Sequence, residues 1–336
     1  MLRERPSSFS TAEDIMNTVS GLFSARVLLT AHELGVFEVL DRGPQSPAKV
    51  AMAIGSDPRA TDRLLNALVA LGLIEKKDGL LTNGPIASMH LVPEKPGFLA
   101  GLSHTAHLWE SWSTLTQAVK TGKCMERPAV NDAGSAWLSS FIAAMHWRAV
   151  RQAPRVVPLV DVPENGRVLD VGGGSGAYSA EFARRGKNVR AVVFDLPNVL
   201  PLTRSYLERE GVSHLVDTVP GDYLTDNFPA GFDVVFLSAI IHSNPPEANV
   251  RLFERCAAAL APGGVLVVQD FIMEPSRTAP IFGAFFALNM LVGTCGGDTF
   301  TENEVAEWMR EAGLDPGALS DTGVGTGLMI GKKPAE

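Results

Sequence analysis

The chain has 336 residues, of which 46% are hydrophobic and 20% are charged, and its formal net charge is −8 at pH 7. This length is typical of two domains or one large one, with enough apolar residues for a sizeable core. The acidic balance argues against a nucleic-acid binder, which usually carries a basic face. The stretch MLRERPSSFSTAEDIM lacks the apolar core of a secretory signal, and no apolar run is long enough to span a membrane, so we expect a cytoplasmic protein.

Three cysteines, Cys124, Cys256 and Cys295, lie far apart in the sequence. Their spacing excludes the common zinc motifs and a disulfide framework, and no metal site is expected. We expect isolated, reduced thiols, as is usual in cytosolic proteins.

The first half of the chain is predicted to be helical. Apolar residues at helical spacing predict a long first helix that Gly35 ends; they are Ile15, Val19, Leu22, Phe23, Val27 and Leu28. Two shorter helices follow, each with a capping residue and a proline, at Ser46-Pro47 and Asp57-Pro58. The segment LIEKKDGLLT predicts a hairpin that turns at Asp78-Gly79. Helix, turn, helix and hairpin in this order are typical of a winged helix.

A winged helix raises the alternative of a transcription regulator that binds DNA. A reading helix offers Arg, Lys, Asn or Gln to base edges and phosphates. Here Arg59, Arg63 and Asn66 are set against Asp57 and Asp62, and the rest of the helix is apolar. Packing or subunit contact is the better interpretation, and the regulator stays open as an alternative.

Residues 98–150 carry aromatic and methionine residues at helical spacing, in HLWESWSTLTQAV and SAWLSSFIAAMHWRAV; they include Trp109, Trp112, Trp137, Phe141, Met145 and Trp147. Such stripes are usually core. The alternative is the wall of an apolar pocket, because aromatic and methionine side chains line such pockets.

The second half alternates strands and helices. Apolar runs predict strands at residues 167–173, 189–196, 232–241 and 264–272, and helices are predicted at 177–185, 197–210 and 245–260, the last ended by Pro262 and Gly263-Gly264. Nearly unbroken Val, Leu and Ile runs indicate strands that are buried on both faces. The prediction is an α/β fold with a doubly wound, mainly parallel sheet, whose ligand site lies at the carboxyl ends of the strands.

A glycine-rich loop, VLDVGGGSGAYS, follows the first of these strands. Gly172, Gly174 and Gly176 are spaced two apart, directly after Asp170; Gly172, Gly174 and Ala177 also fit a dinucleotide fingerprint. Asp195 ends the next strand, where a carboxylate can accept hydrogen bonds from ribose hydroxyls. Loop and carboxylate together favour a nucleoside-bearing cofactor over a bare turn. His242 lies just past the strand at 232–241; taken alone, such a histidine is more often a capping or core residue.

Several segments, in their order and spacing, resemble the class I S-adenosylmethionine-dependent methyltransferases. The chain is most similar to the O-methyltransferases that include plant caffeate-type and bacterial polyketide-tailoring enzymes. The segments are VLDVGGGSG, VVFDLPNV, GDYL, LSAIIH, LAPGGVLVVQDFI and GGDTFTENEVAEWMREAGL. The resemblance covers almost the whole chain. It implies a winged-helix dimerisation domain over residues 1–97, a helical connector lining the acceptor pocket over 98–155, a Rossmann-like catalytic domain over 156–336, and a homodimer.

The resemblance also implies a set of cofactor contacts. Asp170 and the glycines Gly172, Gly174 and Gly176 would shape the methionine end of the S-adenosylmethionine pocket. Asp195 would bind the ribose, and Leu196, Asp222 and Tyr223 would surround the adenine. Tyr223 could equally be an ordinary half-buried aromatic residue. Ser238 would line the pocket near the methionyl part.

For catalysis, the resemblance implies methyl transfer to a hydroxyl of a small aromatic or polyketide-like acceptor. His242 would be the general base and Asp270 its partner, although Asp270 could also be a plain strand-end cap. Met145, Met290 and Thr294 match acceptor-pocket positions. Two positions depart from the family pattern: Ser243-Asn244 follow the base, and Thr299, beside Asp298, stands where a second acidic partner is common. Carbon or nitrogen methylation, or cofactor binding without transfer, remains an alternative.

Overall fold

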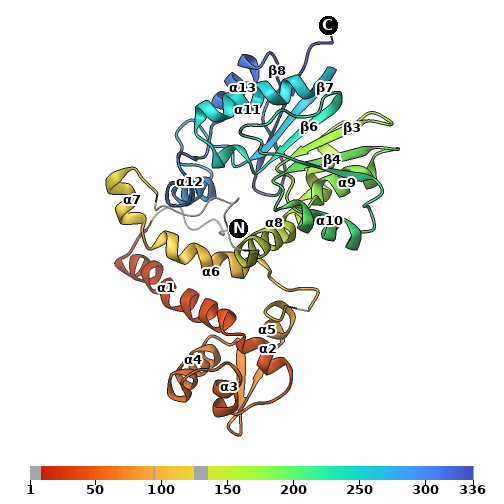
Figure 1. Ribbon diagram of the computed structural model, residues 1–336. Helices are drawn as coiled ribbons and strands as arrows, with labels where there is room; N and C mark the ends of the chain where they lie inside the picture. The colour runs from red at the N-terminus through yellow and green to blue at the C-terminus, as the bar shows by residue number, and fades with distance from the viewer. Residues whose placement is uncertain (1–8, 94, 125–134, 336) are drawn as a thin grey trace. The chain divides into compact units, whose positions relative to one another are not determined.

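The computed structural model describes residues 9–93, 95–124 and 135–335. For residues 135 and 136 it describes the backbone only. The described residues form two compact units, one ending at Trp109 and the other beginning at Glu110 (Figure 1). This division falls inside residues 98–155, the range expected to connect the two domains. Part of that range, residues 125–134, lies outside the described residues.

The first unit contains mainly helices and one hairpin. Its elements are α1 Ala12–Glu33, α2 Val36–Asp41, α3 Pro47–Ala53, α4 Pro58–Ala70, β1 Ile74–Lys77, β2 Leu80–Asn83 and α5 Pro85–His90, and α6 Gly101–Trp112 begins in it. Ser46 and Asp57 cap α3 and α4 through their side chains, as predicted. The hairpin turns at Asp78 and Gly79, both with positive φ (48° and 77°). These residues confirm the predicted helix, turn, helix and hairpin.

Helix α1 forms where the apolar spacing predicted it, and Gly35 follows it in the left-handed conformation (φ 71°). The apolar stripe of α1 does not belong to the hydrophobic core of a single chain, because Leu29 and Ala31 are the buried residues of this helix. Five large apolar side chains are exposed over its first three turns: Ile15 53%, Met16 61%, Val19 57%, Leu22 48% and Phe23 69%. The helix therefore presents an uncovered apolar surface.

The predicted helix over residues 107–119 is divided in two, α6 and α7 (Leu115–Thr121). The hydroxyls of Ser113 and Thr114 bond back to the carbonyls of Glu110 and Ser111, each at 2.6 Å. Such local bonds compete with the helical ladder, which explains the break. The next helix, α8, runs over Ser135–Val156 and leads into a short 3₁₀ turn, η1 (Val157–Leu159).

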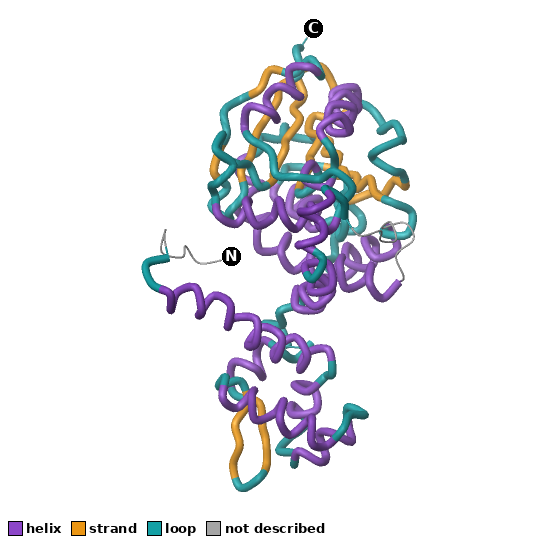
Figure 2. The backbone as a smooth tube through the Cα atoms, turned by 90° about the vertical axis from the view of Figure 1, so that its left-hand side faces the viewer, coloured by secondary structure: helices purple, strands orange, loops and turns teal. Residues whose placement is uncertain are grey.

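The second unit is built around an eight-stranded sheet with the strand order β5-β4-β3-β6-β7-β10-β8, and β9 pairs with β10. Figure 2 shows the strands of this unit in orange among purple helices. The strands are β3 Arg167–Val171, β4 Arg190–Asp195, β5 Val216–Pro220, β6 Phe232–Ser238, β7 Leu260–Asp270, β8 Asp315–Pro316, β9 Ser320–Asp321 and β10 Gly327–Lys332. Strands β3 to β7 are parallel, and β10 is antiparallel to β7. The predicted doubly wound α/β sheet is confirmed, with an antiparallel edge added to it.

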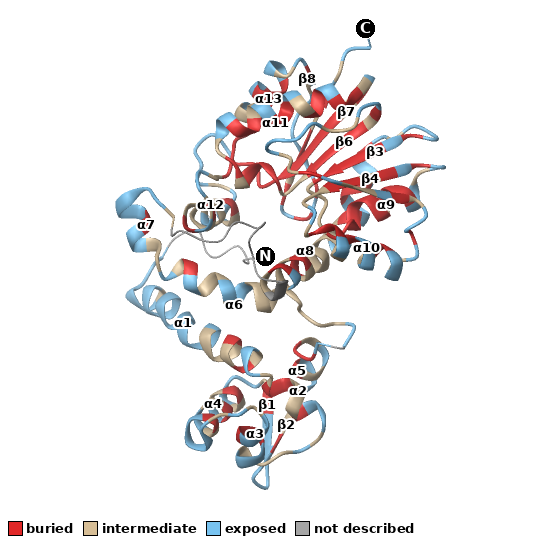
Figure 3. Ribbon diagram, in the orientation of Figure 1, coloured by how far each residue is buried: buried red, intermediate tan, exposed pale blue. Residues whose placement is uncertain are grey.

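Helices cover both faces of this sheet. The remaining elements are α9 Ala177–Arg185, α10 Leu200–Arg209, η2 Ile241–Ser243, α11 Pro246–Ala259, α12 Ile281–Gly293 and α13 Glu302–Glu311. Side chains of α11 and α13 pack into one core cluster, and those of α8, α9 and α10 into another. Figure 3 shows the central strands as the most buried part of this unit.

Helix α11 ends at Ala259, and β7 begins at Leu260, so Pro262 and Gly263-Gly264 lie inside the strand rather than after a helix. The neighbouring strand comes close here. A Cβ atom on Gly264 would lie 3.0 Å from the carbonyl oxygens of Phe232 and Asp233. Glycine thus permits an irregular pairing, with a register shift between Phe232 and Val234.

The expectation of isolated thiols is wrong for two of the three cysteines. The Sγ atoms of Cys124 and Cys295 are 3.3 Å apart, although 171 residues separate them in the sequence. The chain brings the segments after α7 and α12 together, which spacing alone cannot reveal. Cys256 is buried in the core of α11.

No helix within the described ranges is both long and apolar enough to cross a membrane. Over the same ranges, no group of three or more His, Cys, Asp or Glu side chains could hold a metal ion.

Candidate active site

The chemistry-bearing residues lie at the carboxyl ends of four adjacent parallel strands, β4, β3, β6 and β7. The glycine loop follows β3, Asp195 ends β4, Ser238 ends β6 and Asp270 ends β7. Ligands bind at this edge in doubly wound sheets. The topology therefore gathers side chains that are up to 100 residues apart in the sequence.

Three of the loop glycines adopt a conformation that other residues avoid: Gly172 (φ 67°), Gly174 (φ 55°) and Gly176 (φ 74°). A Cβ atom on Gly172 would lie 2.4 Å from the side chain of Ile240, whereas one on Gly174 would meet only Ile142, at 3.7 Å. The loop leads directly into α9, whose first turn has free backbone N–H groups. The loop can thus hold a ligand against its backbone.

Asp170 lies beneath this loop rather than beside it. Its side chain is 1% exposed and accepts a hydrogen bond from the Ser179 hydroxyl at 2.7 Å. A Cβ on Gly173 would lie 2.7 Å from the Asp170 carboxyl carbon. Burial raises the pKa of Asp170 to about 7, and the bond from Ser179 opposes the rise. These contacts fit a carboxyl group that supports the loop from below.

Asp195 connects the end of β4 to the glycine loop. One carboxylate oxygen accepts from the backbone N–H of Gly174 at 2.8 Å, and the other from that of Leu196 at 2.7 Å. Burial raises the pKa of Asp195 to about 6, although both N–H groups favour the ionised form. Each carboxylate oxygen has a second lone pair. The group can therefore also accept from a diol such as ribose.

An open pocket of ≈ 580 Å³ lies beside Asp195, between the ends of β4 and β5. Its lining residues include Leu196, Pro197, Pro220, Gly221 and Asp222. Asp222 accepts from the backbone N–H of Leu224 at 2.8 Å, which shapes the loop after β5. An apolar wall beside a carboxylate that can accept from a diol suits a nucleobase.

Tyr223 and Ser238 lie close to the loop and are both hydrogen-bonded to protein groups. The Tyr223 hydroxyl donates to Asn244 at 3.2 Å, and its ring is 3.9 Å from where a Cβ on Gly172 would be. Ser238 donates to the side-chain oxygen of Gln269 at 2.6 Å. Burial raises the pKa of Tyr223 to about 12, so this phenol stays neutral.

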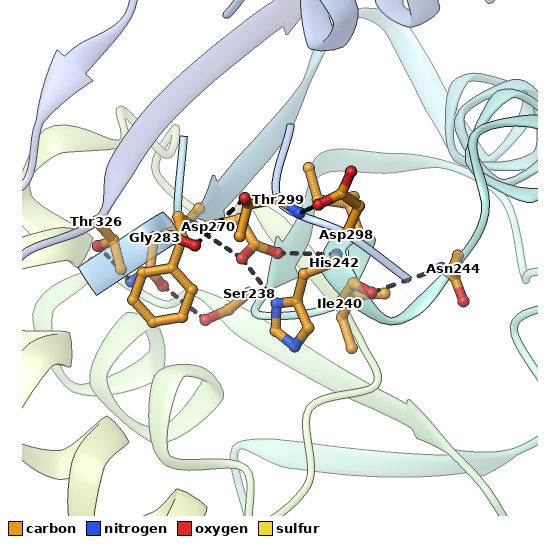
Figure 4. Close-up of polar contacts among 12 residues, drawn as sticks. Ser238, Ile240, His242, Asn244, Asp270, Gly283, Asp298, Thr299 and Thr326 are labelled. Atoms are coloured by element: carbon orange, nitrogen blue, oxygen red, sulfur yellow. Dashed lines mark hydrogen bonds and ion pairs between the residues drawn. The ribbon is translucent and has the colours of Figure 1, made fainter. Parts of the chain in front are cut away.

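His242 and Asp270 form a buried pair, 8% and 2% exposed. His242 Nδ1 lies 2.7 Å from Asp270 Oδ1, and the same carboxylate accepts from the backbone N–H of Phe271 at 2.8 Å. Figure 4 shows the imidazole with one nitrogen toward Asp270 and the other turned away from it. With Nδ1 carrying the proton, Nε2 keeps a lone pair, the arrangement a general base needs.

The two departures from the family pattern have structural explanations. Asn244 is buried and donates to Asn249 at 3.0 Å, which fixes the turn that carries His242. Thr299 is buried, and its hydroxyl donates to the carbonyl of Gly283 (Figure 4). The Asp298 carboxylate pairs with Arg277, and the Asp298 backbone N–H donates to the carbonyl of His242 at 3.0 Å. Among the residues whose side chains are described, Asp270 is the one carboxylate bonded to the His242 ring.

Three phenylalanines surround the base, and the sequence interpretation did not single them out. Phe286 meets the His242 ring edge-on at 4.8 Å, and Phe271 contacts Phe286 and Phe282 at 4.5 and 4.8 Å between ring centres. Phe282 and Phe286 come from α12, whose continuous apolar run FGAFFALNMLVG was the available signal. The base therefore lies against a cluster of phenylalanine rings.

Of the three expected acceptor-pocket residues, Met290 and Thr294 are brought together at the end of α12, whereas Met145 lies on a different helix, α8. Met290 is buried in α12, and Met145 is half-buried on α8. Thr294 caps α12, and its hydroxyl donates to the carbonyl of Met290 at 2.8 Å and accepts from the N–H of Gly297 at 2.9 Å. Thr294 thus shapes the loop after α12.

Comparisons with known proteins agree with this geometry. Residues 136–315 match the O-methyltransferase domain, and residues 16–93 match the O-methyltransferase dimerisation domain. The chain is 31% identical to 3-hydroxy-5-methyl-1-naphthoate 3-O-methyltransferase of Streptomyces sahachiroi, over 89% of this chain and 88% of the relative. It is 29% identical to the tetracenomycin polyketide synthesis 8-O-methyl transferase TcmO of Streptomyces glaucescens, over 96% of both chains.

Among solved structures, the one described as PigF with SAH superposes with a TM-score of 0.86 at 25% identity, covering 96% of this chain and all of that one. Fold and strand-edge site thus define an α/β transferase that uses a nucleoside-bearing cofactor. The chain belongs to the O-methyltransferase family. It is an S-adenosylmethionine-dependent enzyme that transfers a methyl group to a hydroxyl, which sets aside the dinucleotide interpretation of the loop and the carbon- and nitrogen-methylating alternatives.

Proposed function

We propose that this enzyme methylates a phenolic hydroxyl of a small aromatic acceptor and that His242 is the general base. The observation that carries the proposal is the 2.7 Å contact between His242 Nδ1 and Asp270 beside a cluster of phenylalanine rings. A phenol has a pKa near 10, as for tyrosine, and is mostly neutral at pH 7. A base that removes the proton as the new bond forms speeds such a step by roughly a hundred- to ten-thousand-fold.

Asp270 is proposed to hold His242 in the productive tautomer and to stabilise the imidazolium that forms. Because Asp270 is 2% exposed, this stabilisation takes place in a medium of low polarity. The proton that leaves the acceptor hydroxyl is held at Nε2 of His242. Backbone contacts from Phe271 and Asp298 fix both partners in place.

The residues at the strand edge fit S-adenosylmethionine, which supplies an electrophilic methyl group on sulfur. We propose that Gly172, Gly174 and Gly176 hold its methionyl end, with Ser238 close by and Asp170 supporting the loop. Asp195 would bind the ribose; Leu196, Asp222 and Tyr223 would enclose the adenine, next to the ≈ 580 Å³ pocket. S-adenosylhomocysteine would leave from the same site.

The acceptor is proposed to be a hydroxylated, polyketide-like aromatic compound. The Phe271, Phe282 and Phe286 cluster offers ring faces and edges for stacking. The relatives named above act on a naphthoate and on a tetracenomycin-type polyketide. Met145, Met290 and Thr294 stay proposed acceptor-pocket positions.

A homodimer is proposed from the apolar surface of α1 and the dimerisation domain matched at residues 16–93. The first unit would form the dimer and contribute to the acceptor pocket of the partner subunit. We propose that the chain is divided by function into a dimerisation domain (1–97), a helical connector (98–155) and a catalytic domain (156–336). We expect no nucleic-acid partner, from the acidic composition, and no membrane partner and a cytoplasmic location, from the lack of a signal-like or membrane-length apolar run in the sequence.

The base is tested with His242→Gln and with two phenols, one of ordinary pKa and one, such as a nitrophenol, that is ionised at the assay pH. We expect kcat for the ordinary phenol to fall by roughly a hundred- to ten-thousand-fold. For the ionised phenol the loss should be at most about tenfold, because no proton has to be removed. Calorimetric titration should give an unchanged Kd for S-adenosylmethionine.

His214→Gln, at an exposed position on the loop before β5, is the matched control and should change neither quantity. Equal losses for both phenols would assign His242 to positioning the acceptor. Undiminished turnover would show that no base at this position is needed.

A further inference from the structure

One cation lies near the His242–Asp270 pair, and its partner among the described residues is an aromatic ring rather than a hydrogen-bond acceptor. Arg148 lies in the middle of α8, and its guanidinium carbon is 4.7 Å from the centre of the Phe271 ring. Phe271 directly follows Asp270 and donates its N–H to that carboxylate. The positive charge therefore lies over a ring that belongs to the active site.

Within the described residues, no hydrogen bond or ion pair holds this guanidinium, although the side chain is half-buried. Burial lowers the pKa of Arg148, and the nearby charge of Asp270 opposes this. The oxygens of Asp270 already accept from His242 and Phe271. Five N–H donors without a protein acceptor, on a side chain that is half-buried rather than fully enclosed, are available to an acceptor on a ligand.

The planar guanidinium fork matches a carboxylate, which it binds through two parallel hydrogen bonds. Two carboxylates could reach an active site of this kind, one on the methyl acceptor and one on the methionyl end of the cofactor. On α8, Ile142 and His146 are the residues that face the glycine loop: Ile142 lies beside Gly174, and His146 Nδ1 is 2.9 Å from the Ser175 hydroxyl. Arg148 is placed instead against the phenylalanine cluster beside His242.

We propose that Arg148 binds a carboxylate of the methyl acceptor, so that the preferred acceptors are hydroxylated aromatic acids. The inference rests on the proposed function, because it assumes that the pocket around Phe271 and His242 holds the acceptor. With the ring of the acid packed on the phenylalanines and its carboxylate on Arg148, the hydroxyl to be methylated is oriented with respect to His242. Arg148 is then a specificity-determining residue.

The test uses calorimetric titration of enzyme saturated with S-adenosylhomocysteine. The probes are a panel of hydroxynaphthoic and hydroxybenzoic acids and their primary amides, which differ from the acids in charge. We expect at least one acid to bind the wild type at least about tenfold more tightly than its amide, as charge-assisted hydrogen bonds allow. Arg148→Met should remove this difference, weakening acid binding about ten- to a hundredfold and leaving amide binding within about twofold.

Arg148→Lys keeps the charge without the fork and should retain part of the preference. Arg151→Met is the matched control. Arg151 is exposed one turn further along α8 and also lies over an aromatic ring, that of Trp147, at 4.0 Å. Its loss should leave the acid-to-amide ratio unchanged.

Three outcomes would overturn the proposal. A wild type that binds no acid more tightly than its amide has no carboxylate site. Equal weakening of acid and amide by Arg148→Met would show a packing role. If Arg148→Met instead weakens S-adenosylmethionine binding tenfold while the acid-to-amide ratio stays, the carboxylate belongs to the cofactor. These titrations measure binding and require no methyl transfer. A wild-type protein that prefers acids over amides but methylates no phenol would therefore contradict the proposed function and leave the Arg148 proposal standing.

Discussion

At the scale of single residues, Asp170 shows how the glycine loop is held. Its carboxyl group is buried beneath Gly173 and bonded to Ser179, and burial raises its pKa to about 7. The folded protein therefore binds this proton more tightly than the unfolded chain, in which the pKa is 3.8. Between about pH 4 and pH 7 the carboxyl group of Asp170 is ionised in the unfolded chain and still protonated in the folded state. Asp170 therefore stabilises the fold below pH 4, and this contribution to the free energy of unfolding is lost as the pH rises to 7.

Asp170→Asn removes this dependence, because the amide is neutral and still accepts from Ser179. We expect the variant to become more stable than the wild type as the pH rises from 4 to 7, with a constant advantage above pH 7. A pKa shift of about three units corresponds to an upper limit on the order of 4 kcal/mol in the free energy of unfolding.

Urea denaturation at half-unit pH steps measures this difference, with Asp217→Asn on the exposed side of β5 as the control. A difference between Asp170→Asn and the wild type that does not change between pH 4 and pH 7 would contradict the raised pKa.

Residues at strand ends could be predicted from the sequence. Asp195, His242 and Asp270 each follow an apolar run, and parallel strands bring their carboxyl ends to one edge. Arg148 and His146 could not be predicted in the same way. Their direction depends on how α8 packs on the sheet, and the local pattern of that helix, rich in apolar and aromatic residues, fits either core or pocket.

At the scale of secondary structure, the strands of the second unit with long apolar runs were predictable, and those with a weak apolar signal were not. The strands β3, β4, β6 and β7 have buried, Val-rich sequences, whereas β5 has the sequence VDTVP, whose Asp and Pro weaken the strand signal. Strand β10, GLMIGK, contains two glycines and follows the turn-forming stretch DTGVGTG. Its pairing with β7 depends on contacts some 60 residues apart, which no local pattern contains.

The segments that follow α7 and α12 meet at Cys124 and Cys295, whose Sγ atoms are 3.3 Å apart. A disulfide needs about 2.05 Å, so a small movement of these segments suffices. We expect diamide to join the two thiols, each losing one hydrogen atom as the diamide is reduced to its hydrazine. Peptide mapping by mass spectrometry before and after reduction would identify the cross-link.

Cys256 supplies the internal comparison, because it is buried and burial raises the pKa of its thiol. Cys256→Ser should leave cross-linking intact, while Cys124→Ser and Cys295→Ser should each abolish it. A cross-link that forms in either of the last two variants would contradict the observed proximity.

At the scale of the whole molecule, the uncovered apolar surface of α1 is the feature that one chain leaves unexplained. At 100° per residue, Ile15, Met16, Val19, Leu22 and Phe23 fall within an arc of about 120°, which makes one continuous apolar face. Monomeric proteins rarely expose such a patch. The patch overlaps the segment that matches the dimerisation domain, residues 16–93, so a second copy of the chain is the occupant we propose.

A dimer formed through this patch should be broken by the double variant Val19→Asp, Phe23→Asp, because burying two carboxylates in an apolar interface costs several kcal/mol. We expect sedimentation equilibrium to show a monomer at concentrations where the wild type is a dimer. Asn17→Asp is the control, because Asn17 lies on the opposite side of the same helix, and this variant should remain a dimer. The proposed cofactor residues all lie in the second unit, so we expect the monomer to bind S-adenosylmethionine with the wild-type Kd. Acceptor turnover should fall if the partner subunit completes the acceptor pocket. A double variant that stays dimeric would place the interface elsewhere on the first unit.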